Sequence, residues 1–355
     1  MRGMKKVISS IKGIDERIMR KAQTRLDSLT KPPGSLGRLE ELARVIAGIT
    51  GKAMPRLNEK VIFTLAADHG VCAENISAFP SDVTVQMVGN FLKGGAGINV
   101  LAGHIGARVV VADLGVKSDF APRFSKKLKR KKVNFGTRNF ILGPAMSRGE
   151  AVRSVQNGID IFEEELDRGI DIIGTGEMGI GNTTASSAIA ACITRTDPSE
   201  TAGRGTGLGD KALQHKITVI RKALEVNRPD PGDALDVLSK VGGFEIGGLA
   251  GIMLAAASRK VPVVLDGFIS GAAALIAVGL QPKVKEYMIA SHCSVERGHK
   301  VILEYLGIDP VLNLDLRLGE GTGAALGIFI AEAATKILTG MATFQQARVS
   351  ERKSP

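Results

Sequence analysis

Five short apolar runs recur along the chain, and each one stops at a cluster of Gly, Asp, Ser, His or Glu residues. Stretches with the residue spacing of helices, rich in Ala and Gly, separate these runs. Short apolar runs that alternate with helices are typical of the buried strands of a parallel sheet. We therefore predict an α/β fold with a parallel sheet, whose strands include residues 61–67, 108–112, 171–173, 261–265 and 287–290.

Polar side chains follow every predicted strand. The clusters are Asp68-His69, Asp113, the loop around Glu177, Asp266 and Ser291-His292. Open parallel sheets bind ligands beyond the carboxyl ends of their strands, so these clusters should meet at one edge of the sheet. Packing alone does not require polar residues there five times, and we predict an active site at this edge. For His69 and His292, capping or hydrogen bonding is the alternative role.

Two glycine-rich loops each carry one glutamate just before a helix of small residues. They are residues 176–184, with Glu177, and residues 314–327, with Glu320. Glycine has no Cβ, so backbone and carboxylate can approach a ligand together. The alternative is a strand-to-helix turn with a solvated glutamate. The sequence has no Ser/His/Asp arrangement, and the candidates for acid–base chemistry are Glu177, Glu320, Asp68, His69, His292 and His299.

The loop 179–184 also suits an anion. At the start of a helix it would offer free N–H groups, two threonine hydroxyls and the positive end of the helix dipole. A second glycine-rich segment, residues 203–211, supplies Arg204 and Lys211, and Lys216 follows on the next helix. The sequence thus predicts a phosphate ligand, although neither loop matches a P-loop or a dinucleotide-binding motif. Two glycine-rich turns without a ligand are the alternative.

The chain is basic, with a formal net charge of +11 and a pI near 9.6. Part of this charge lies in one run, residues 126–132, where six of seven residues are Lys or Arg. Such a run is usually a solvated face. Aromatic residues make up only 4% of the chain and Trp is absent, which disfavours stacking platforms for nucleic acid. We therefore do not expect a nucleic-acid partner.

The cysteines, Cys72, Cys192 and Cys293, are far apart and form no CxxC pair, so neither a disulfide framework nor a zinc site is indicated. The histidines lack the spacing of metal ligands. The N-terminal segment lacks the apolar core of a signal peptide, and no stretch approaches roughly 18 uninterrupted apolar residues. We predict a cytoplasmic protein with no membrane span, no metal and no cofactor.

Helices are predicted at both ends of the chain. Apolar residues recur at helical spacing over residues 14–29 and 36–46, and Pro32-Pro33 separates the two helices. Ser35 is placed to cap the second of them. The last predicted helix covers about residues 324–339 and leads into a polar tail.

Nine segments, taken together and in order, resemble the nicotinate-nucleotide:dimethylbenzimidazole phosphoribosyltransferases of cobalamin assembly. The pair GEMGIGNTT and LGEGTG is the most specific part of the resemblance, which extends from about residue 30 to residue 335. The segments are KPPGSLGRLE (31–40), ADHGV (67–71), SAFPSDVT (77–84), GTRN (136–139), GEMGIGNTT (176–184), GRGTG (203–207), DGF (266–268), SH (291–292) and LRLGEGTG (316–323).

The resemblance implies a Rossmann-like parallel sheet flanked by helices, with a small helical domain from both chain ends. Residues 1–55 would form the helical part of the small domain, residues 56–323 the large catalytic domain, and residues 324–355 the helix that completes the small domain. The resemblance also implies a homodimer. The implied reaction transfers phosphoribose from nicotinate mononucleotide to 5,6-dimethylbenzimidazole or a related base, giving α-ribazole phosphate and nicotinate without a metal.

The resemblance also implies roles for individual residues. A carboxylate must remove a proton from the benzimidazole, and the LGEGTG motif gives this role to Glu320. Glu177 is the second candidate, or it holds the ribose or tunes Glu320. The residues implied for phosphate and ribose are Gly179, Gly181, Asn182, Thr183, Gly205, Lys216 and Ser291. Those implied for the base are Phe79, Pro80, Met87 and Leu318. Better-known bacterial members have a serine and a glutamine where this chain has Phe79 and Met87, which implies a more apolar base pocket and leaves the accepted base open.

Two other functions remain as alternatives. The first is a NAD-dependent oxidoreductase on the same kind of sheet, although no acidic residue follows a clean GxGxxG motif. The second is a basic protein that binds nucleic acid through residues 126–132, which a steep salt dependence of DNA or RNA affinity would reveal.

Overall fold

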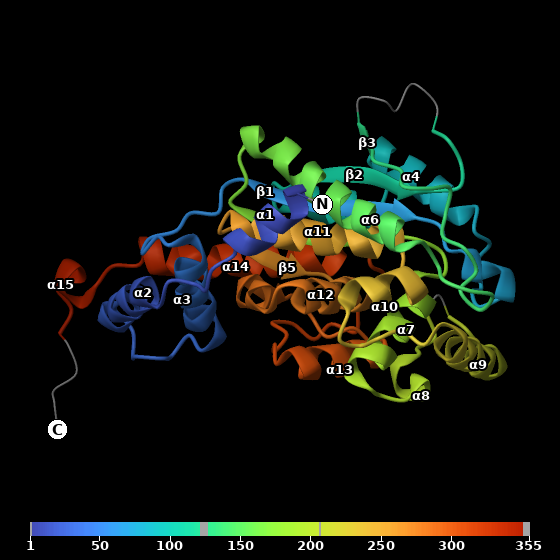
Figure 1. Ribbon diagram of the computed structural model, residues 1–355. Coiled ribbons are helices and arrows are strands. Elements are labelled where there is room, and N and C mark those ends of the chain that lie inside the picture. Colours follow the sequence, from blue (N-terminus) through green and yellow to red (C-terminus); the bar gives the residue numbers. More distant parts are fainter. Residues whose placement is uncertain (1, 121–126, 206, 351–355) are drawn as a thin grey trace.

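The computed structural model describes residues 2–120, 127–205 and 207–350. Its centre is one sheet of parallel strands in the order β3-β2-β1-β4-β5-β6 (Figure 1). The order turns back between β1 and β4, as in a doubly wound Rossmann sheet, so the predicted fold class is confirmed. The strands are β1 (Lys60–Ala67), β2 (Arg108–Gly115), β3 (Leu128–Arg130), β4 (Ile172–Met178), β5 (Val263–Leu265) and β6 (Met288–Ala290).

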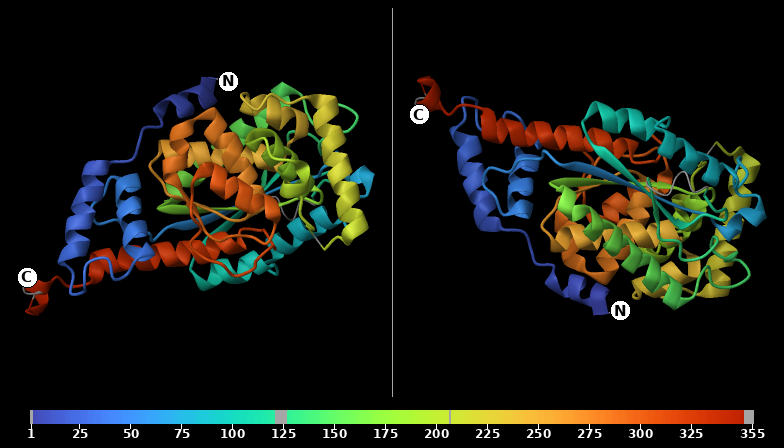
Figure 2. Two further views of the ribbon diagram at one scale, coloured as in Figure 1. Left: turned by 90° about the horizontal axis from the view of Figure 1, so that it is seen from below. Right: turned by 90° about the horizontal axis from the view of Figure 1, so that it is seen from above.

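Helices cover both faces of the sheet (Figures 1 and 2). One face packs against α6 (Arg148–Glu165), α11 (Phe244–Ser258) and α12 (Phe268–Leu280), and the other against α4 (Val83–Lys93), α5 (Gly97–His104) and α14 (Thr322–Gly340). The side chains of β1 alternate between the two cores. Phe63 and Leu65 belong to the first core, and Ile62 and Ala66 belong to the second. Because both faces are buried, the strand reads as an unbroken apolar run.

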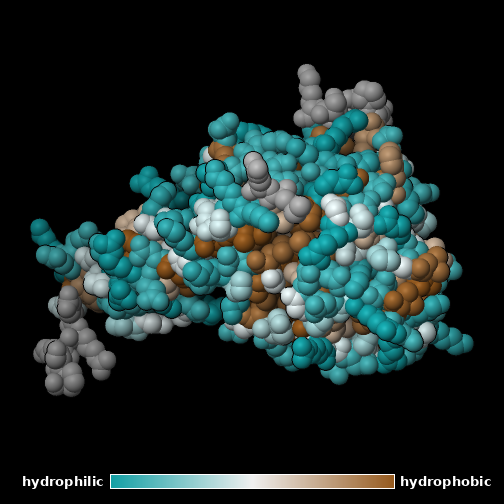
Figure 3. Space-filling view, in the orientation of Figure 1, coloured by the Kyte–Doolittle hydropathy of each residue, from teal (hydrophilic) through white to brown (hydrophobic). Residues whose placement is uncertain are grey.

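The remaining helices connect the strands or lie at the chain ends. Most of the surface in the view of Figure 3 is hydrophilic, with an apolar area over α11 and α12 beside α1. The remaining helices are α1 (Arg2–Ser10), α2 (Glu16–Ser28), α3 (Arg38–Thr50), α7 (Asn182–Thr194), α8 (Pro198–Thr201), α9 (Asp210–Asn227), α10 (Ala234–Val241), α13 (Arg297–Leu306) and α15 (Phe344–Ala347).

Strand β3 and helix α6 were not predicted from the sequence. β3 is only three residues long and lies within the basic run, so neither length nor apolar alternation indicates it. α6 does carry a local signal, because Ser147 and Glu150 form a capping box at its start. The structure also extends β2 through Asp113 and β4 through Glu177, so these acidic side chains stand at strand ends.

Helices α2 and α3, from the N-terminal part of the chain, lie beside the C-terminal helix α14 at one end of the molecule (Figure 2). α2 and α3 contact α14, and Nε of Arg25 donates to the carbonyl oxygen of Leu338 at 2.7 Å. α1 packs instead against α11 and α6. The predicted cap at Ser35 is wrong: Gly37 takes the N-cap position of α3, because the chain makes a further turn before the helix starts at Arg38.

Helix α14 links the chain ends to the sheet. It contacts both β4 and β5 of the sheet and α3, and it runs unbroken across residue 323. The proposed domain boundaries therefore stay a prediction. By length and composition α14 would also pass as a membrane span, but 50% of that stretch is buried inside the protein, which is typical of a core helix.

Ion pairs hold the described part of the basic run. Nζ of Lys129 lies 2.9 Å from a carboxylate oxygen of Glu165, and Nζ of Lys131 lies 2.6 Å from Glu164. Both acids belong to α6. Lys126 lies outside the described residues. These pairs favour a structural, solvated face over a nucleic-acid patch.

Helices α6 and α11 pack closely against each other at glycine positions. This close packing gives a first testable prediction. A β-carbon at Gly158 would overlap the carbonyl oxygen of Gly248. Gly158→Ala should therefore lower the free energy of unfolding by about 1–3 kcal/mol, the usual cost of overpacking. Urea unfolding followed by circular dichroism measures this change.

The control for Gly158→Ala is Gly149→Ala at the start of the same helix. A β-carbon there would meet only Oγ of Ser147, at an ordinary 3.9 Å. Alanine favours a helix by about 0.5–1 kcal/mol over glycine, so this variant should be neutral or more stable. Equal stabilities of the two variants would contradict the claim that α6 and α11 pack tightly at Gly158.

Candidate active site

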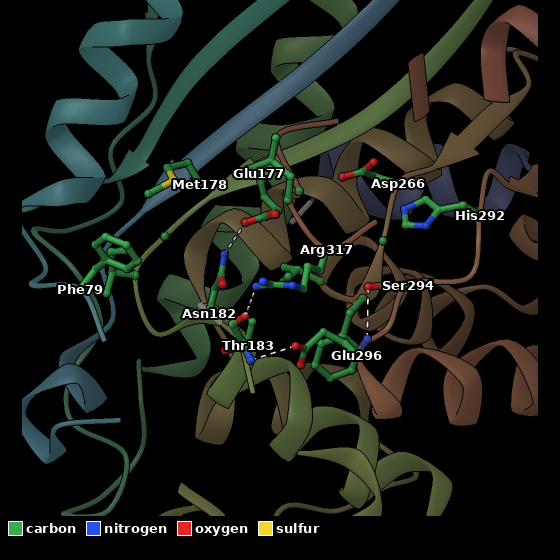
Figure 4. A pocket seen from close by; sticks show the side chains of 18 residues that line it. Phe79, Glu177, Met178, Asn182, Thr183, Asp266, His292, Ser294, Glu296 and Arg317 are labelled. Carbon is green, nitrogen blue, oxygen red and sulfur yellow. Dashed lines mark hydrogen bonds between the residues drawn. The ribbon is translucent and has the colours of Figure 1, made fainter. Parts of the chain in front are cut away.

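A cavity of about 290 Å³ opens at the carboxyl edge of the sheet. Its wall comes from the loops after β4, β5 and β6, from the loop before α14, and from Phe79 and Gly205. In the view of Figure 4, Arg317 lies between Glu177 on one side and Glu296 on the other. The predicted position of the site beyond the strand ends therefore agrees with this cavity.

The structure brings together about half of the residues assigned from the sequence. Those that line the cavity are Glu177, Gly179, Asn182, Thr183, Gly205, Phe79 and Leu318. Those that do not are Glu320, Gly181, Lys216, Ser291, Pro80 and Met87. Ser291 is fully buried, and its hydroxyl donates to the carbonyl oxygen of Asp266. Met87 is half-buried and packs on the second core, away from the cavity wall.

Glu177 stands on the cavity wall near the end of β4 and is only 6% exposed. Its Oε2 accepts a hydrogen bond from Nδ2 of Asn182. Burial, reinforced by the nearby charges of Asp266 and Glu245, raises the pKa of Glu177 to about 8. This carboxyl group therefore keeps its proton to a higher pH than an ordinary glutamate does. Gly319 approaches the other oxygen, Oε1, so closely that a β-carbon at 319 would overlap it.

Glu320 follows Leu318 and Gly319, two residues of the cavity wall, and is not itself among the lining residues. Its carboxylate is 5% exposed, and Oε2 accepts the backbone N–H of Ile98, in the first turn of α5, at 3.2 Å. Its backbone φ of 65° is in the left-handed region, which is uncommon for any residue but glycine. The carboxylate reaches α5 through its bond to Ile98. Burial raises the pKa of Glu320 above its ordinary value.

Asp266 connects the two glutamate loops. It follows β5, lines the cavity, and accepts backbone N–H groups of Gly321 at 3.1 Å, Gly323 at 2.7 Å and Ala324 at 3.0 Å. The carboxylate thus caps the start of α14. Burial raises its pKa to about 7. The sequence indicated Asp266 as a strand-end residue but gave no sign of this cap.

The first turn of α7 forms the part of the cavity wall that suits an anionic ligand. Gly181, at φ 93°, precedes the helix, and Asn182 and Thr183 open it. Oγ1 of Thr183 accepts from Nζ of Lys216 at 2.8 Å, which leaves the hydroxyl hydrogen for a ligand. Lys216 is fully buried, and burial lowers its pKa to about 8. The lysine therefore supports the helix start from behind instead of lining the cavity.

The glycine-rich loop at Gly205 is held from both sides. Its N–H donates to Oε1 of Glu296 at 2.8 Å, and its carbonyl oxygen accepts from Nη1 of Arg317 at 3.3 Å (Figure 4). Sequence reasoning missed both Glu296 and Arg317. Arg317 lies inside the LRLGEGTG segment, which was the available signal, whereas Glu296 had none.

Part of the cavity wall is apolar. Phe79 and Leu318, the two base-site residues that line it, are half or more exposed at 51% and 61%. Met178 and Ile180, which follow Glu177, complete this part and were not predicted. A flat apolar ring would fit here next to the carboxylates.

His69 and His299 are held by buried hydrogen bonds, whereas His292 lines the cavity. Nε2 of His69 lies 2.7 Å from Oε1 of Glu245, and both side chains are fully buried. Nδ1 of His299 accepts the backbone N–H of Ser294 at 3.0 Å, and burial lowers the pKa of His299 to about 3. His292 lines the cavity, and burial lowers its pKa as well. His292 and His299 are therefore neutral near pH 7.

The cavity thus combines a helix start for a phosphate, buried carboxylates for proton transfer, and an apolar wall for a ring. These are the requirements of an enzyme that moves the sugar phosphate of a nucleotide. A family model described as phosphoribosyltransferase matches residues 11–349. The chain is accordingly a phosphoribosyltransferase.

Individual relatives narrow this class. The chain is 57% identical over 351 residues to the nicotinate-nucleotide–dimethylbenzimidazole phosphoribosyltransferase of Desulforudis audaxviator, covering 99% of both chains. It is 55% identical to the enzyme of the same name from Chloroflexus aurantiacus, covering 97% of this chain and 98% of the relative. The crystal structure of CobT from Thermus thermophilus superimposes with a TM-score of 0.90 at 43% identity, covering 95% of this chain and 100% of that one. The chain belongs to the nicotinate-nucleotide–dimethylbenzimidazole phosphoribosyltransferase family, as the resemblance predicted.

Proposed function

We propose that this protein transfers phosphoribose from nicotinate mononucleotide to 5,6-dimethylbenzimidazole or a related base. The products are α-ribazole phosphate and nicotinate, and the step belongs to nucleotide-loop assembly of cobalamin. The observation that carries this proposal is the cavity of about 290 Å³ in which Glu177 and Asp266 face the start of α7 and an apolar wall.

The chemistry follows from these parts. The N–H groups at the start of α7, with Thr183, bind the phosphate. The bond between ribose C1′ and the pyridinium nitrogen breaks, and its electron pair stays on that nitrogen. A ring nitrogen of the benzimidazole forms the new bond to C1′ from the opposite face, and a carboxylate accepts the proton from its other nitrogen. We assign the role of proton acceptor to Glu320 on the basis of its motif, and Glu177 is the alternative acceptor.

Turnover without a divalent metal is part of the proposal, because the leaving pyridinium becomes a neutral ring without help from a Lewis acid. Incubation with nicotinate mononucleotide and a panel of bases should release nicotinate and form the riboside phosphate, measured by chromatography. Adding a chelator should leave the rate unchanged. No nicotinate release with any base would overturn the proposed function, and loss of turnover in chelator that magnesium restores would overturn the metal-free mechanism.

We extend the proposal to a cytoplasmic homodimer. Val100 on α5 and Phe329 on α14 are exposed apolar side chains on helices that contact each other, and a second copy would cover them.

Among the described residues there is no group of three or more His, Cys, Asp or Glu placed to hold a metal ion. The oxidoreductase and nucleic-acid alternatives have no comparable support, since the family is that of a transferase and acids of α6 pair with the basic run.

A further inference from the structure

The charges on the cavity wall are strongly uneven. Three carboxyl groups line it, those of Glu177, Asp266 and Glu296, and each is at least nine-tenths buried. Among the described lining residues Arg317 is the one with a permanently positive side chain. His292, also on the wall, has its pKa lowered by burial. An anionic ring substituent that enters this cavity therefore has one strong cationic partner available.

Arg317 is placed to act on a ligand. Its side chain is exposed, and Figure 4 shows the guanidinium inside the ring of lining residues. One N–H, on Nη1, donates to the carbonyl oxygen of Gly205 at 3.3 Å. A guanidinium carries five N–H donors in a planar fork, so this bond leaves further donors for a carboxylate.

Nicotinate mononucleotide carries two anionic groups, and the structure accounts for one of them. The start of α7, backed by Lys216, suits the phosphate. The carboxylate on the pyridinium ring needs a second donor, and the apolar side formed by Phe79, Met178 and Ile180 offers none. We propose that Arg317 binds the ring carboxylate and makes the enzyme prefer nicotinate mononucleotide over nicotinamide mononucleotide. This inference rests on the proposed function.

The same contact should strengthen as the reaction proceeds. In the substrate the ring is a pyridinium, so ring and carboxylate together carry no net charge. When the C1′–N bond breaks and its electron pair returns to the nitrogen, the leaving group becomes the nicotinate anion. An adjacent guanidinium therefore stabilises the leaving group more than the bound substrate, which favours the transition state.

The test compares both nucleotides on matched variants. We expect the wild-type protein to favour nicotinate mononucleotide in kcat/KM. Arg317→Gln should lose about 10- to 100-fold with this substrate, the range of one charge-assisted hydrogen bond, and change little with nicotinamide mononucleotide. Arg317→Lys should recover part of the loss. Arg297→Gln, an exposed arginine at the start of α13 that does not line the cavity, is the control and should behave like wild type.

Equilibrium binding provides a readout that does not depend on turnover. Free nicotinate should bind Arg317→Gln about 10- to 100-fold more weakly than wild type, whereas ribose 5-phosphate should bind both equally. Equal losses of kcat/KM for both nucleotides would overturn the inference and indicate that Arg317 supports the Gly205 loop. Weaker binding of ribose 5-phosphate would also overturn it and indicate that Arg317 binds the phosphate. Unchanged nicotinate binding would overturn it too. Nicotinate release by the wild type would leave the proposed function intact in each of these cases.

Discussion

Replacement of Glu320 by glutamine is expected to slow phosphoribose transfer by about 10²- to 10⁴-fold, the usual contribution of a general base. Substrate affinity should change much less, because the amide keeps the shape of the side chain. Its carbonyl oxygen can still accept the N–H of Ile98, which now bonds to Oε2 at 3.2 Å. Single-turnover rates and equilibrium binding of each substrate separate the loss of rate from the loss of affinity.

Glu177 is the matched comparison, because it is the other buried glutamate next to the flanking glycines and it lies on the cavity wall. If Glu177 holds the ribose, Glu177→Gln should chiefly weaken the binding of nicotinate mononucleotide. If Glu177 is the base, this variant becomes the slow enzyme and Glu320→Gln stays within a few-fold of wild type. A solvated turn glutamate would leave turnover unchanged, but Glu320 at 5% exposure is not one.

The pH dependence of kcat/KM decides between the two glutamates independently. A general base works only when it is deprotonated, so activity rises with pH through its pKa. The pKa of Glu177 is raised to about 8, mainly by burial, and a rate that climbs until about pH 8 would mark Glu177 as the base. Such a profile, measured where the benzimidazole itself is mostly unprotonated and lost in Glu177→Gln, would contradict the assignment to Glu320.

The strands and the edge that carries the site could be predicted because their signals are local. An apolar run that ends in a polar cluster is a property of a few neighbouring residues, and it placed Glu177 and Asp266 at strand ends correctly. The start of α7 was predictable for the same reason. Strand β3 was not, because its three residues pair with β2 only through the tertiary fold.

The residues missed at the cavity depend on contacts between distant parts of the chain. Gly205 bonds to Glu296, 91 positions away, and to Arg317, 112 positions away. No periodicity or motif in either loop encodes these pairings. For Glu320 the motif could be recognised from the sequence, but the position of its side chain could not. Its backbone is left-handed, at φ 65°, and its carboxylate bonds to α5. The spacing of the glycines does not reveal this contact.

Gly319→Ala is expected to reduce kcat/KM by about 10²-fold or more, comparable with the loss of an acid–base group. A β-carbon at 319 would overlap Oε1 of Glu177, so the carboxylate must leave its position opposite Asn182. The φ of 81° at Gly319 adds backbone strain of about 1–2 kcal/mol for alanine. Activity and thermal unfolding are measured on the same preparation, so that lost catalysis is not mistaken for lost protein.

Gly307→Ala is the control that isolates the overlap. Gly307 ends α13 at φ 64°, so alanine there bears the same backbone strain, but a β-carbon at 307 would meet nothing within 4 Å. It should lower the stability of the protein by about 1–2 kcal/mol and leave kcat/KM unchanged. If both variants lose activity equally, backbone strain explains the effect and the contact of Gly319 with Glu177 does not. Activity lost only in Gly319→Ala would show that turnover depends on where this loop holds the Glu177 carboxylate.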